Sequence, residues 1–288
     1  MIIDAHQHYW QPARGDYGWL AQAPAALQRV FGPDDLHAAR EAAGVSASVL
    51  VQAAPTEAET RYLFDLARQD TAVAGVVGWV DMAAPGAPAR IDALVHDGGG
   101  RLCGLRPMVQ DIADPDWLAR PALDAAFDRL IHHGLAFDAL VSVRQLPALR
   151  ERLARHPLLR VVLDHGAKPA IAQGDFRPWA QAIDTLARLP GVHCKLSGLL
   201  TQLDGDMHEA AIEPYVGHLF ASFGARRLMW GSDWPVLTTH ADYGHWLRLA
   251  RRLVRHYAPD QHDAVFGANA ARFYGLAVAG PVTDGVAP

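Results

Sequence analysis

Short apolar runs of the kind that form buried strands recur along this chain, and helical segments lie between them. Eight such runs can be identified, and most lack the alternation of polar and apolar residues that marks a half-exposed strand. They are spaced roughly thirty residues apart, the size of one βα unit. The expected strands are Ile2–His8, Ala47–Ala53, Val73–Asp81, Cys103–Met108, Ala136–Val141, Arg160–His165, Val192–Ser197 and Leu228–Asp233.

Helical patterns separate the expected strands, and the clearest are Glu57–Gln69, Pro121–His132, Leu146–Arg155, Pro178–Leu189 and Ala241–Tyr257. Eight strands alternating with helices predict an α/β protein whose fold is a single, distorted (β/α)₈ TIM barrel. An open doubly wound sheet is the alternative, and a dinucleotide-binding sheet of that kind has a glycine-rich turn after its first strand. The first strand here runs into His6-Gln7-His8-Tyr9-Trp10, without glycine.

The chain has 288 residues, enough for one large domain. We expect the barrel to occupy residues 1–275 and a proline- and glycine-rich tail to occupy residues 276–288. Residues 10–35 also contain several glycines and prolines, and they predict a long loop over the mouth of the barrel.

Composition excludes several classes of function. The formal net charge is −5, which does not suit a protein that binds nucleic acid. No apolar run approaches the ~20 residues that span a bilayer, so no membrane partner is expected. The N-terminus lacks a basic segment followed by an apolar one, which predicts a cytoplasmic protein. Cys103 and Cys194 both lie in apolar runs and are expected to be buried free thiols.

Ionisable residues gather where the expected strands end, which in a barrel is the edge that holds the active site. His6 and His8 lie two residues apart on the first strand and therefore face the same way. Two such imidazoles can bind one divalent ion or one substrate atom. Only one residue of the pair Asp164 and His165 is expected to point inward, and we favour His165 as a ligand or electrophile.

Two further strand ends contribute catalytic candidates. Asp233, after the eighth strand, can bind a metal ion, accept a hydrogen bond from a histidine or take a proton from water. Arg106, after the fourth, can polarise a carbonyl group or bind a carboxylate. The only two lysines, Lys168 and Lys195, also fall at strand ends, and a pocket role and a structural role are both open for them.

Taken together, these motifs resemble those of the amidohydrolase superfamily. More narrowly, they are similar to its sugar-lactonase branch, which includes enzymes like L-fuconolactonase and L-rhamnonolactonase. The resemblance extends from the first strand to about Tyr274, and it rests on Ile3–His8, Gly104–Arg106, Leu163–Pro169 and Met229–Pro235. It implies a distorted barrel and hydrolysis at a carbonyl carbon.

The resemblance also bears on metal. Metal-dependent members use a carboxylated lysine or a glutamate after strand four or five, and a histidine after strand five. Here strand four offers Arg106 and strand five ends in Leu140-Val141-Ser142, so neither ligand has a counterpart. His6, His8, His165 and Asp233 remain, enough for one divalent ion, such as zinc, or for none. The branch implies catalysis without an obligatory metal, and no organic cofactor is expected.

The resulting hypothesis is a hydrolase that opens a sugar lactone to the aldonic acid, with a small molecule as its only expected partner. Asp233 takes a proton from the attacking water, and Arg106 and the three histidines stabilise the oxyanion. The residues expected to bind the sugar are Trp10, Gln52, Trp79, Asp81, Lys168 and Trp234.

Three alternatives remain open: a metal-dependent decarboxylase, a pyrone-dicarboxylate lactonase, and a non-catalytic sugar-binding barrel. Strand ends offer only three cations besides histidine, and Lys195 is expected to pair with Asp164 or Asp233. Too few cations then remain for two carboxylates, which favours a neutral lactone as substrate. Among neutral lactones, the lactone of a deoxy sugar is expected to fit best.

Overall fold

The apolar runs form a closed ring of parallel strands in the computed structural model, which describes residues 1–205 and 207–277. Among these residues eight strands lie in the order of the chain: β1 Ile2–Gln7, β2 Val45–Val51, β3 Val73–Gly78, β4 Leu102–Leu105, β5 Ala136–Ala139, β6 Val161–Leu163, β7 Val192–Leu196 and β8 Leu228–Trp230. Backbone hydrogen bonds from Asp233 N to His6 O (2.8 Å) and from His8 N to Trp234 O (2.7 Å) join the two ends of the sheet. The predicted (β/α)₈ barrel is therefore confirmed.

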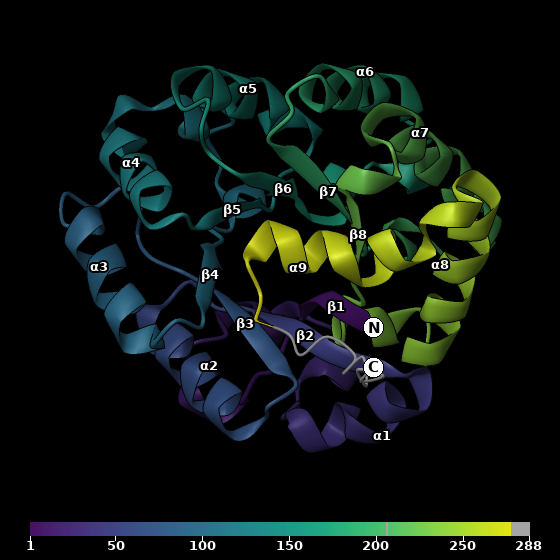
Figure 1. Ribbon diagram of the computed structural model, residues 1–288, viewed down its shortest axis with the longest axis horizontal. Coiled ribbons are helices and arrows are strands. Elements are labelled where there is room, and N and C mark those ends of the chain that lie inside the picture. The colour runs from purple at the N-terminus through teal and green to yellow at the C-terminus, as the bar shows by residue number, and fades with distance from the viewer. Residues whose placement is uncertain (206, 278–288) are drawn as a thin grey trace, which may run out of the picture.

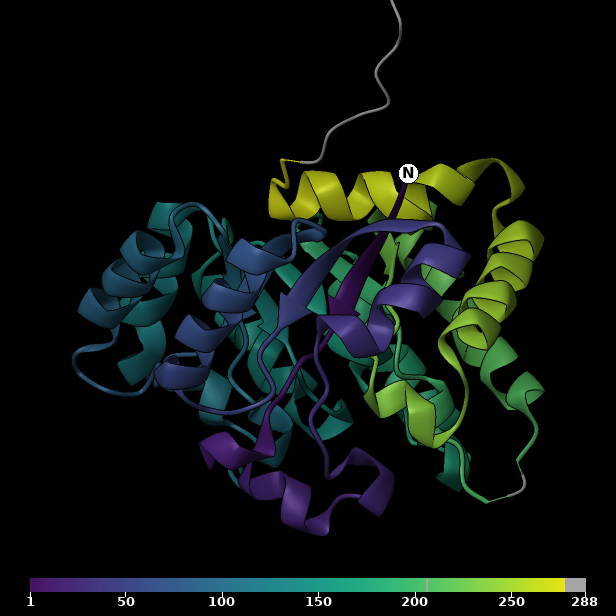
Figure 2. The same cartoon turned by 90° about the horizontal axis from the view of Figure 1, so that it is seen from below.

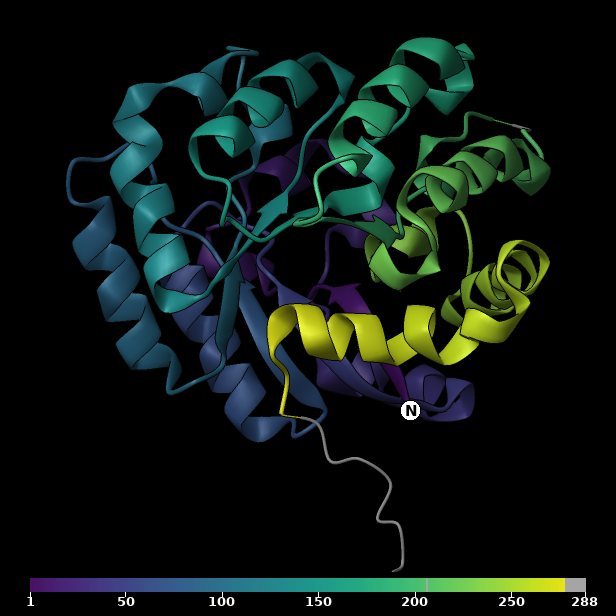
Figure 3. The same cartoon turned by 45° about the horizontal axis from the view of Figure 1, so that its top comes forward.

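Helices surround the strands as an outer layer (Figures 1 and 3). They are α1 Pro33–Ala43, α2 Glu57–Gln69, α3 Ala87–Gly98, α4 Asp124–His133, α5 Leu146–Arg155, α6 Phe176–Ala187, α7 Glu213–Phe223, α8 Tyr243–Tyr257 and α9 Asn269–Tyr274. The helix α2 illustrates why they form: Thr56 accepts a hydrogen bond from Glu59 N at its start, and Leu63, Phe64 and Ala67 form its buried stripe. The helices α1, α3, α7 and α9 are additional to those predicted.

The two apolar cores have different shapes. The larger lies between the strands and the outer helices, whereas the smaller fills the inside of the barrel with small side chains such as Ala47, Val49 and Val77. Phe273 and Tyr274 of α9 complete the inner core. Figure 2 shows α9 and the segment after β1 at opposite ends of the barrel, so α9 closes the end where the strands begin.

Several predicted strands were too long at their carboxyl ends. β3 ends at Gly78 rather than Asp81, β6 at Leu163 rather than His165, and β8 at Trp230 rather than Asp233. The polar residues beyond these points belong to loops and short 3₁₀ helices, where the chain leaves the ladder and the alternation of the strand no longer sets the direction of the side chains. This difference decides the geometry of the site below.

The segment after β1 was predicted as a loop over residues 10–35. It contains three short 3₁₀ helices, Pro12–Arg14, Gly18–Gln22 and Ala25–Leu27, and α1 already begins at Pro33. Of the predicted tail, residues 278–288 lie outside the described residues, and Leu276 packs against the inner core. Cys103 and Cys194 are buried and free, as expected. Among the described residues, none of the helices has the length and apolar character that crossing a bilayer requires.

Candidate active site

A cavity of about 230 Å³ opens at the carboxyl ends of the strands. Its polar lining consists of side chains from four loops, and its apolar lining comes partly from the segment after β1. The lining residues are His8, Trp10, Trp19, Ala53, Arg106, Met108, Gln110, Asp111, Leu140, His165, Lys168, Asp233 and Val236. The cavity is smaller than the roughly 300–1,000 Å³ typical for drug-sized ligands, so it suits a single small ring.

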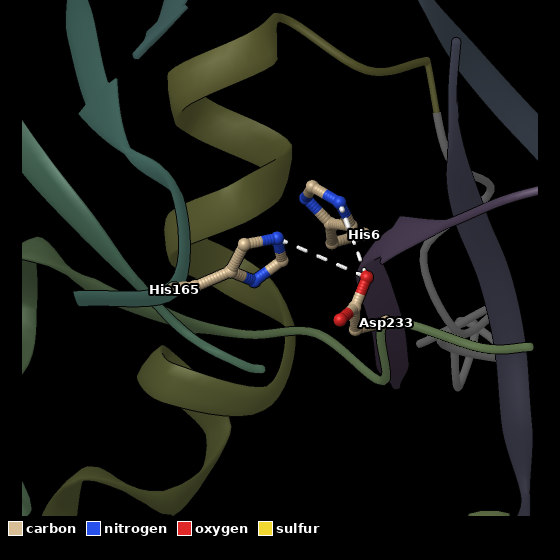
Figure 4. Close-up of side chains that lie close together, drawn as sticks. All are labelled: His6, His165 and Asp233. Carbon is tan, nitrogen blue, oxygen red and sulfur yellow. Dashed lines mark ion pairs between the residues drawn. The ribbon is translucent and has the colours of Figure 1, made fainter. Parts of the chain in front are cut away.

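Three histidines and one carboxylate converge at the base of this cavity, and Figure 4 shows three of the four. The Nε2 atoms of His6 and His8 are 3.1 Å apart. Asp233 Oδ1 lies 3.3 Å from His8 Nε2, 3.7 Å from His6 Nε2 and 3.8 Å from His165 Nε2. The structure therefore brings His6, His8, His165 and Asp233 together, as the sequence predicted.

Partners behind the rings orient two of these imidazoles. The Nδ1 atom of His8 lies 2.8 Å from the carbonyl oxygen of Val51, which can only accept, so His8 donates from Nδ1. The Nδ1 atom of His165 lies 2.9 Å from Ser197 Oγ. Both rings thus present Nε2 toward Asp233.

The expectation that only one residue of the pair Asp164 and His165 points inward was wrong. β6 ends at Leu163, and His165 then adopts the left-handed conformation with a φ of 55°. This turn breaks the alternation of the strand, so that Asp164 Oδ1 lies 3.3 Å from His6 Nδ1 while His165 faces Asp233. Asp233 itself has a φ of 60°, backbone strain of the kind that clusters at functional sites.

A buried ion-pair cluster lies beneath the histidines. The ammonium nitrogen of Lys195 is 2.6 Å from Asp138 Oδ2 and 3.0 Å from Asp164 Oδ1, and all three side chains are fully buried. Burial alone would lower the pKa of Lys195, but the two carboxylates outweigh it and raise that pKa. Lys195 thus pairs with Asp164, one of the two predicted partners, and with Asp138 instead of Asp233.

Asp138 was missed because the predicted fifth strand was judged by its last residues, Leu140 and Val141. The signal was present in the sequence: Asp138 is the single charge in an otherwise apolar run, and burying it requires a partner. Tyr274 of α9 also donates a hydrogen bond to Asp138 Oδ2, at 2.6 Å, from the closed end of the barrel.

Arg106 lines the cavity, and its guanidinium is held from behind. Its Nε donates to Gln52 Oε1 at 3.1 Å, its Nη2 donates to the same oxygen at 2.8 Å, and its Nη1 lies 3.5 Å from Asp164 Oδ2. The Gln52 amide donates its own hydrogen bond to Ala54 O. Gln52, predicted to bind sugar hydroxyls, is thus fully buried and occupied with Arg106, and it does not line the cavity.

Two of the predicted sugar-binding residues line the cavity, and the others do not. Trp10 and Lys168 line the cavity, and Lys168 Nζ donates to Gln110 Oε1 at 2.7 Å. Trp79 and Asp81 instead line a neighbouring cavity, because the chain turns away from the axis after β3. Trp234 is buried against Phe31 and lines neither of these two cavities.

Trp19 was not predicted, yet it forms part of the apolar wall beside Trp10. The two indole rings meet edge to face with centroids 5.2 Å apart, and Trp19 Nε1 donates to Ala53 O at 2.8 Å. Sequence reasoning missed Trp19 because it lies in a loop, where periodicity says nothing about direction.

Four donor atoms at the base of the cavity have the chemistry that suits a divalent ion. Ligand atoms bound tetrahedrally at ~2.0–2.1 Å from zinc lie roughly 3.3 Å from one another, and the separations given above are similar. Nitrogen and carboxylate oxygen are also ligands that zinc prefers. His6, His165 and Asp233 alone already offer three buried ligand atoms within 4.8 Å of one another. The residues present can therefore surround one ion.

The protonation states suit either a metal ion or a base. Burial lowers the pKa of His165 to about 4 and that of His6 well below its ordinary value. Burial would raise the pKa of Asp233, but the charge interactions with His165 and the neighbouring histidines outweigh it and leave this pKa below its usual range. At neutral pH the site thus holds an ionised carboxylate beside a neutral His165 ring.

Several known proteins are similar to this chain. The family model described as Amidohydrolase matches residues 3–276. An L-fucono-1,5-lactonase of Burkholderia ambifaria is 49% identical, over 94% of each chain. A second L-fucono-1,5-lactonase, of Burkholderia multivorans, is 37% identical over 95% of this chain and 96% of the relative. The crystal structure of an amidohydrolase of Burkholderia multivorans with bound zinc superimposes with a TM-score of 0.89 at 36% identity, over 96% of this chain and 99% of that one.

Proposed function

We propose that this chain, which belongs to the amidohydrolase family, hydrolyses the internal ester of a sugar lactone to give the open aldonic acid. The observation that carries this proposal is the buried carboxylate of Asp233 beside three imidazoles, in a cavity the size of one ring. The similarity to two L-fucono-1,5-lactonases over nearly the whole chain supports the same reaction. The enzyme is therefore a carboxylic-ester hydrolase, a lactonase.

Asp233 acts as the general base. Its Oδ1 faces the cavity and accepts a proton from the water that attacks the lactone carbonyl carbon. Because His165 is neutral above about pH 4, its ring does not hold the carboxylate in an ion pair at neutral pH. When the carbonyl re-forms and the ring C–O bond breaks, Asp233 returns the proton to the departing ring oxygen.

Donors around the carbonyl oxygen stabilise the negative charge that develops during attack. Arg106 lines the cavity with its guanidinium fixed by Gln52 and Asp164, so no reorganisation is needed when charge appears. His165 faces the same space. A divalent ion held by His6, His8, His165 and Asp233 would add Lewis-acid polarisation of the carbonyl.

The charges of the cavity favour a neutral sugar lactone over a dicarboxylated pyrone. Of the lysine and arginine residues in the described chain, Arg106 and Lys168 line the cavity, and Arg106 already lies beside Asp164. Two buried carboxylates on a substrate would each need their own cationic partner. Trp10, Trp19 and Val236 form an apolar wall for the C–H face or methyl group of a 6-deoxy sugar. We therefore expect L-fucono-1,5-lactone as substrate.

A substrate panel tests this function. Acid release is followed with a pH indicator for L-fucono-1,5-lactone, L-rhamnonolactone, L-galactonolactone and pyrone-4,6-dicarboxylate, with spontaneous hydrolysis subtracted. Carbon dioxide release from 5-carboxyvanillate is measured in parallel. We expect the highest kcat/KM for a neutral deoxy lactone. A preference for the pyrone would refute the charge argument, and carbon dioxide release would assign the site to decarboxylation.

A further inference from the structure

Lys195 is positioned to control which nitrogen of His6 has the hydrogen atom. Its ammonium group donates hydrogen bonds to Asp138 Oδ2 at 2.6 Å and to His6 Nδ1 at 3.0 Å, and it forms an ion pair with Asp164 Oδ1 at 3.0 Å. An ammonium group has no lone pair, so it can only donate to Nδ1 of His6. A neutral imidazole that accepts at Nδ1 has its hydrogen on Nε2.

The contact on the other side of the ring leads independently to the same tautomer. The Nε2 atoms of His6 and His8 are 3.1 Å apart, a hydrogen-bond distance, so in the metal-free site one of them donates to the other. His8 donates from Nδ1 to Val51 O, so a neutral His8 ring has a lone pair on its Nε2. Beside such a ring, His6 is the donor at Nε2.

Two other neighbours of His6 favour the opposite tautomer, but both lie farther from the ring than Lys195 does. Asp164 Oδ1 could accept a hydrogen from His6 Nδ1, but it is 3.3 Å away, farther than Lys195. Arg106 Nη1 could donate to a lone pair on His6 Nε2, but it is 3.4 Å away and lies beside Asp164. With the hydrogen on Nδ1 instead, lone pairs on His6 and His8 would face each other at 3.1 Å.

We propose that Lys195 fixes His6 in the tautomer with the hydrogen on Nε2 and thereby weakens the binding of divalent metal at this site. A metal ion needs the lone pair of that same Nε2 atom, because the Nε2 atom of His6 is the one that faces the other donor atoms. Metal binding therefore requires the hydrogen to move to Nδ1 and the ammonium to give up one acceptor. Lys195 acts here as a positioning residue that reaches the site only through His6.

The tautomer can be measured directly in the unaltered enzyme. Chelator-treated protein with ¹⁵N-labelled histidine is recorded by long-range ¹H–¹⁵N correlation, and the His6 signals are identified by their loss in His6→Gln. We expect a neutral ring with the hydrogen on Nε2. A hydrogen on Nδ1 of His6 would overturn the proposal without reference to any variant.

Zinc affinity of the chelator-treated protein, measured by competition with a chromogenic chelator, tests the consequence. The double variant Lys195→Met with Asp138→Asn removes the donor without changing the net charge of the cluster and leaves no unpaired buried charge on Asp138. We expect zinc to bind about tenfold more tightly or better, the range that partners behind metal-bound histidines usually control. An affinity equal to or below that of the unaltered enzyme would refute the proposal.

Lys168→Met is the matched control, because it removes the only other lysine of the chain. Lys168 raises the positive charge around His165 and Asp233, but its ammonium binds Gln110 and makes no hydrogen bond to His6. We expect a smaller gain in zinc affinity from this variant than from the double variant. An equal or larger gain from Lys168→Met would show that the contact between Lys195 and His6 has no special part in zinc binding, which contradicts the proposal.

Discussion

Gly198 lies so close to His165 that one added methyl group should displace the ring. A Cβ atom at Gly198 would be 2.5 Å from His165 Nδ1, whereas ordinary contact begins at 3.4 Å, so ring or backbone must move by about 0.9 Å. The same movement breaks the 2.9 Å contact between His165 and Ser197. Because misplacing a catalytic group by ~1 Å can cost about 10²-fold, we expect Gly198→Ala to lower kcat/KM by about that factor.

Backbone strain must be separated from the effect on His165. Gly198 has a φ of 60°, where alanine costs roughly 1–2 kcal/mol of folding stability. Gly174→Ala supplies the control, because Gly174 has a φ of 71° and nothing within 4 Å of its added Cβ. In urea unfolding, both variants should lose a similar amount of unfolding free energy because of the backbone strain. Gly198→Ala should lose more because of the clash with His165. Only Gly198→Ala should lose activity.

Steady-state kinetics on the best lactone and urea unfolding are measured for the unaltered enzyme, Gly198→Ala and Gly174→Ala. If Gly198→Ala folds and retains nearly full kcat/KM, the placement of His165 does not limit the reaction and the reasoning is wrong. If Gly174→Ala loses as much activity as Gly198→Ala, the effect comes from general destabilisation instead.

Three further predictions address the base, the metal and the closed end of the barrel. Asp233→Asn, assayed after chelation, should fold and lower kcat at least ~10²-fold, and a folded variant with near-full kcat would exclude Asp233 as base. Chelation alone should leave most activity, and a loss that zinc restores would contradict this. His193 packs on Phe273, and burial lowers its pKa to about 4 from an ordinary value of 6.5. The unfolded chain therefore binds more protons in this window, and stability is lost as the pH falls from 6.5 toward 4. His193→Phe should remove about 1–2 kcal/mol of this loss at pH 5, and equal slopes of unfolding free energy against pH in both proteins would refute the assignment.

The barrel and the four converging donors were predictable because both follow from periodicity. Eight unbroken apolar runs indicate strands buried on both faces, and residues at their carboxyl ends must meet at one edge. His6 and Asp233 come from opposite ends of the chain, yet this rule alone brings them together.

The features of the site that were not predicted depend on departures from strand periodicity. The left-handed turn at His165 directs both it and Asp164 inward, and no strand pattern foretells such a turn. Gln52 lies at a strand end as expected, but the sequence does not show that Arg106 occupies its amide. Trp79 follows β3 on a chain that bends away from the axis, so a residue at a strand end reaches a different cavity.

The closure of the barrel between its last and first strands also has a consequence for protein synthesis. The hydrogen bonds that close the ring join residues 6 and 8 to residues 233 and 234, the same segments that supply His6, His8 and Asp233. A chain interrupted before β8 therefore has an open sheet edge, which invites association with other chains, and lacks Asp233, the residue proposed to activate water. Since translation proceeds from the N-terminus, a growing chain lacks the complete set of proposed site residues until Asp233 has emerged, and α9 covers the opposite end only afterwards. The complete site and protection from aggregation are thus acquired together, when the last fifth of the chain is made.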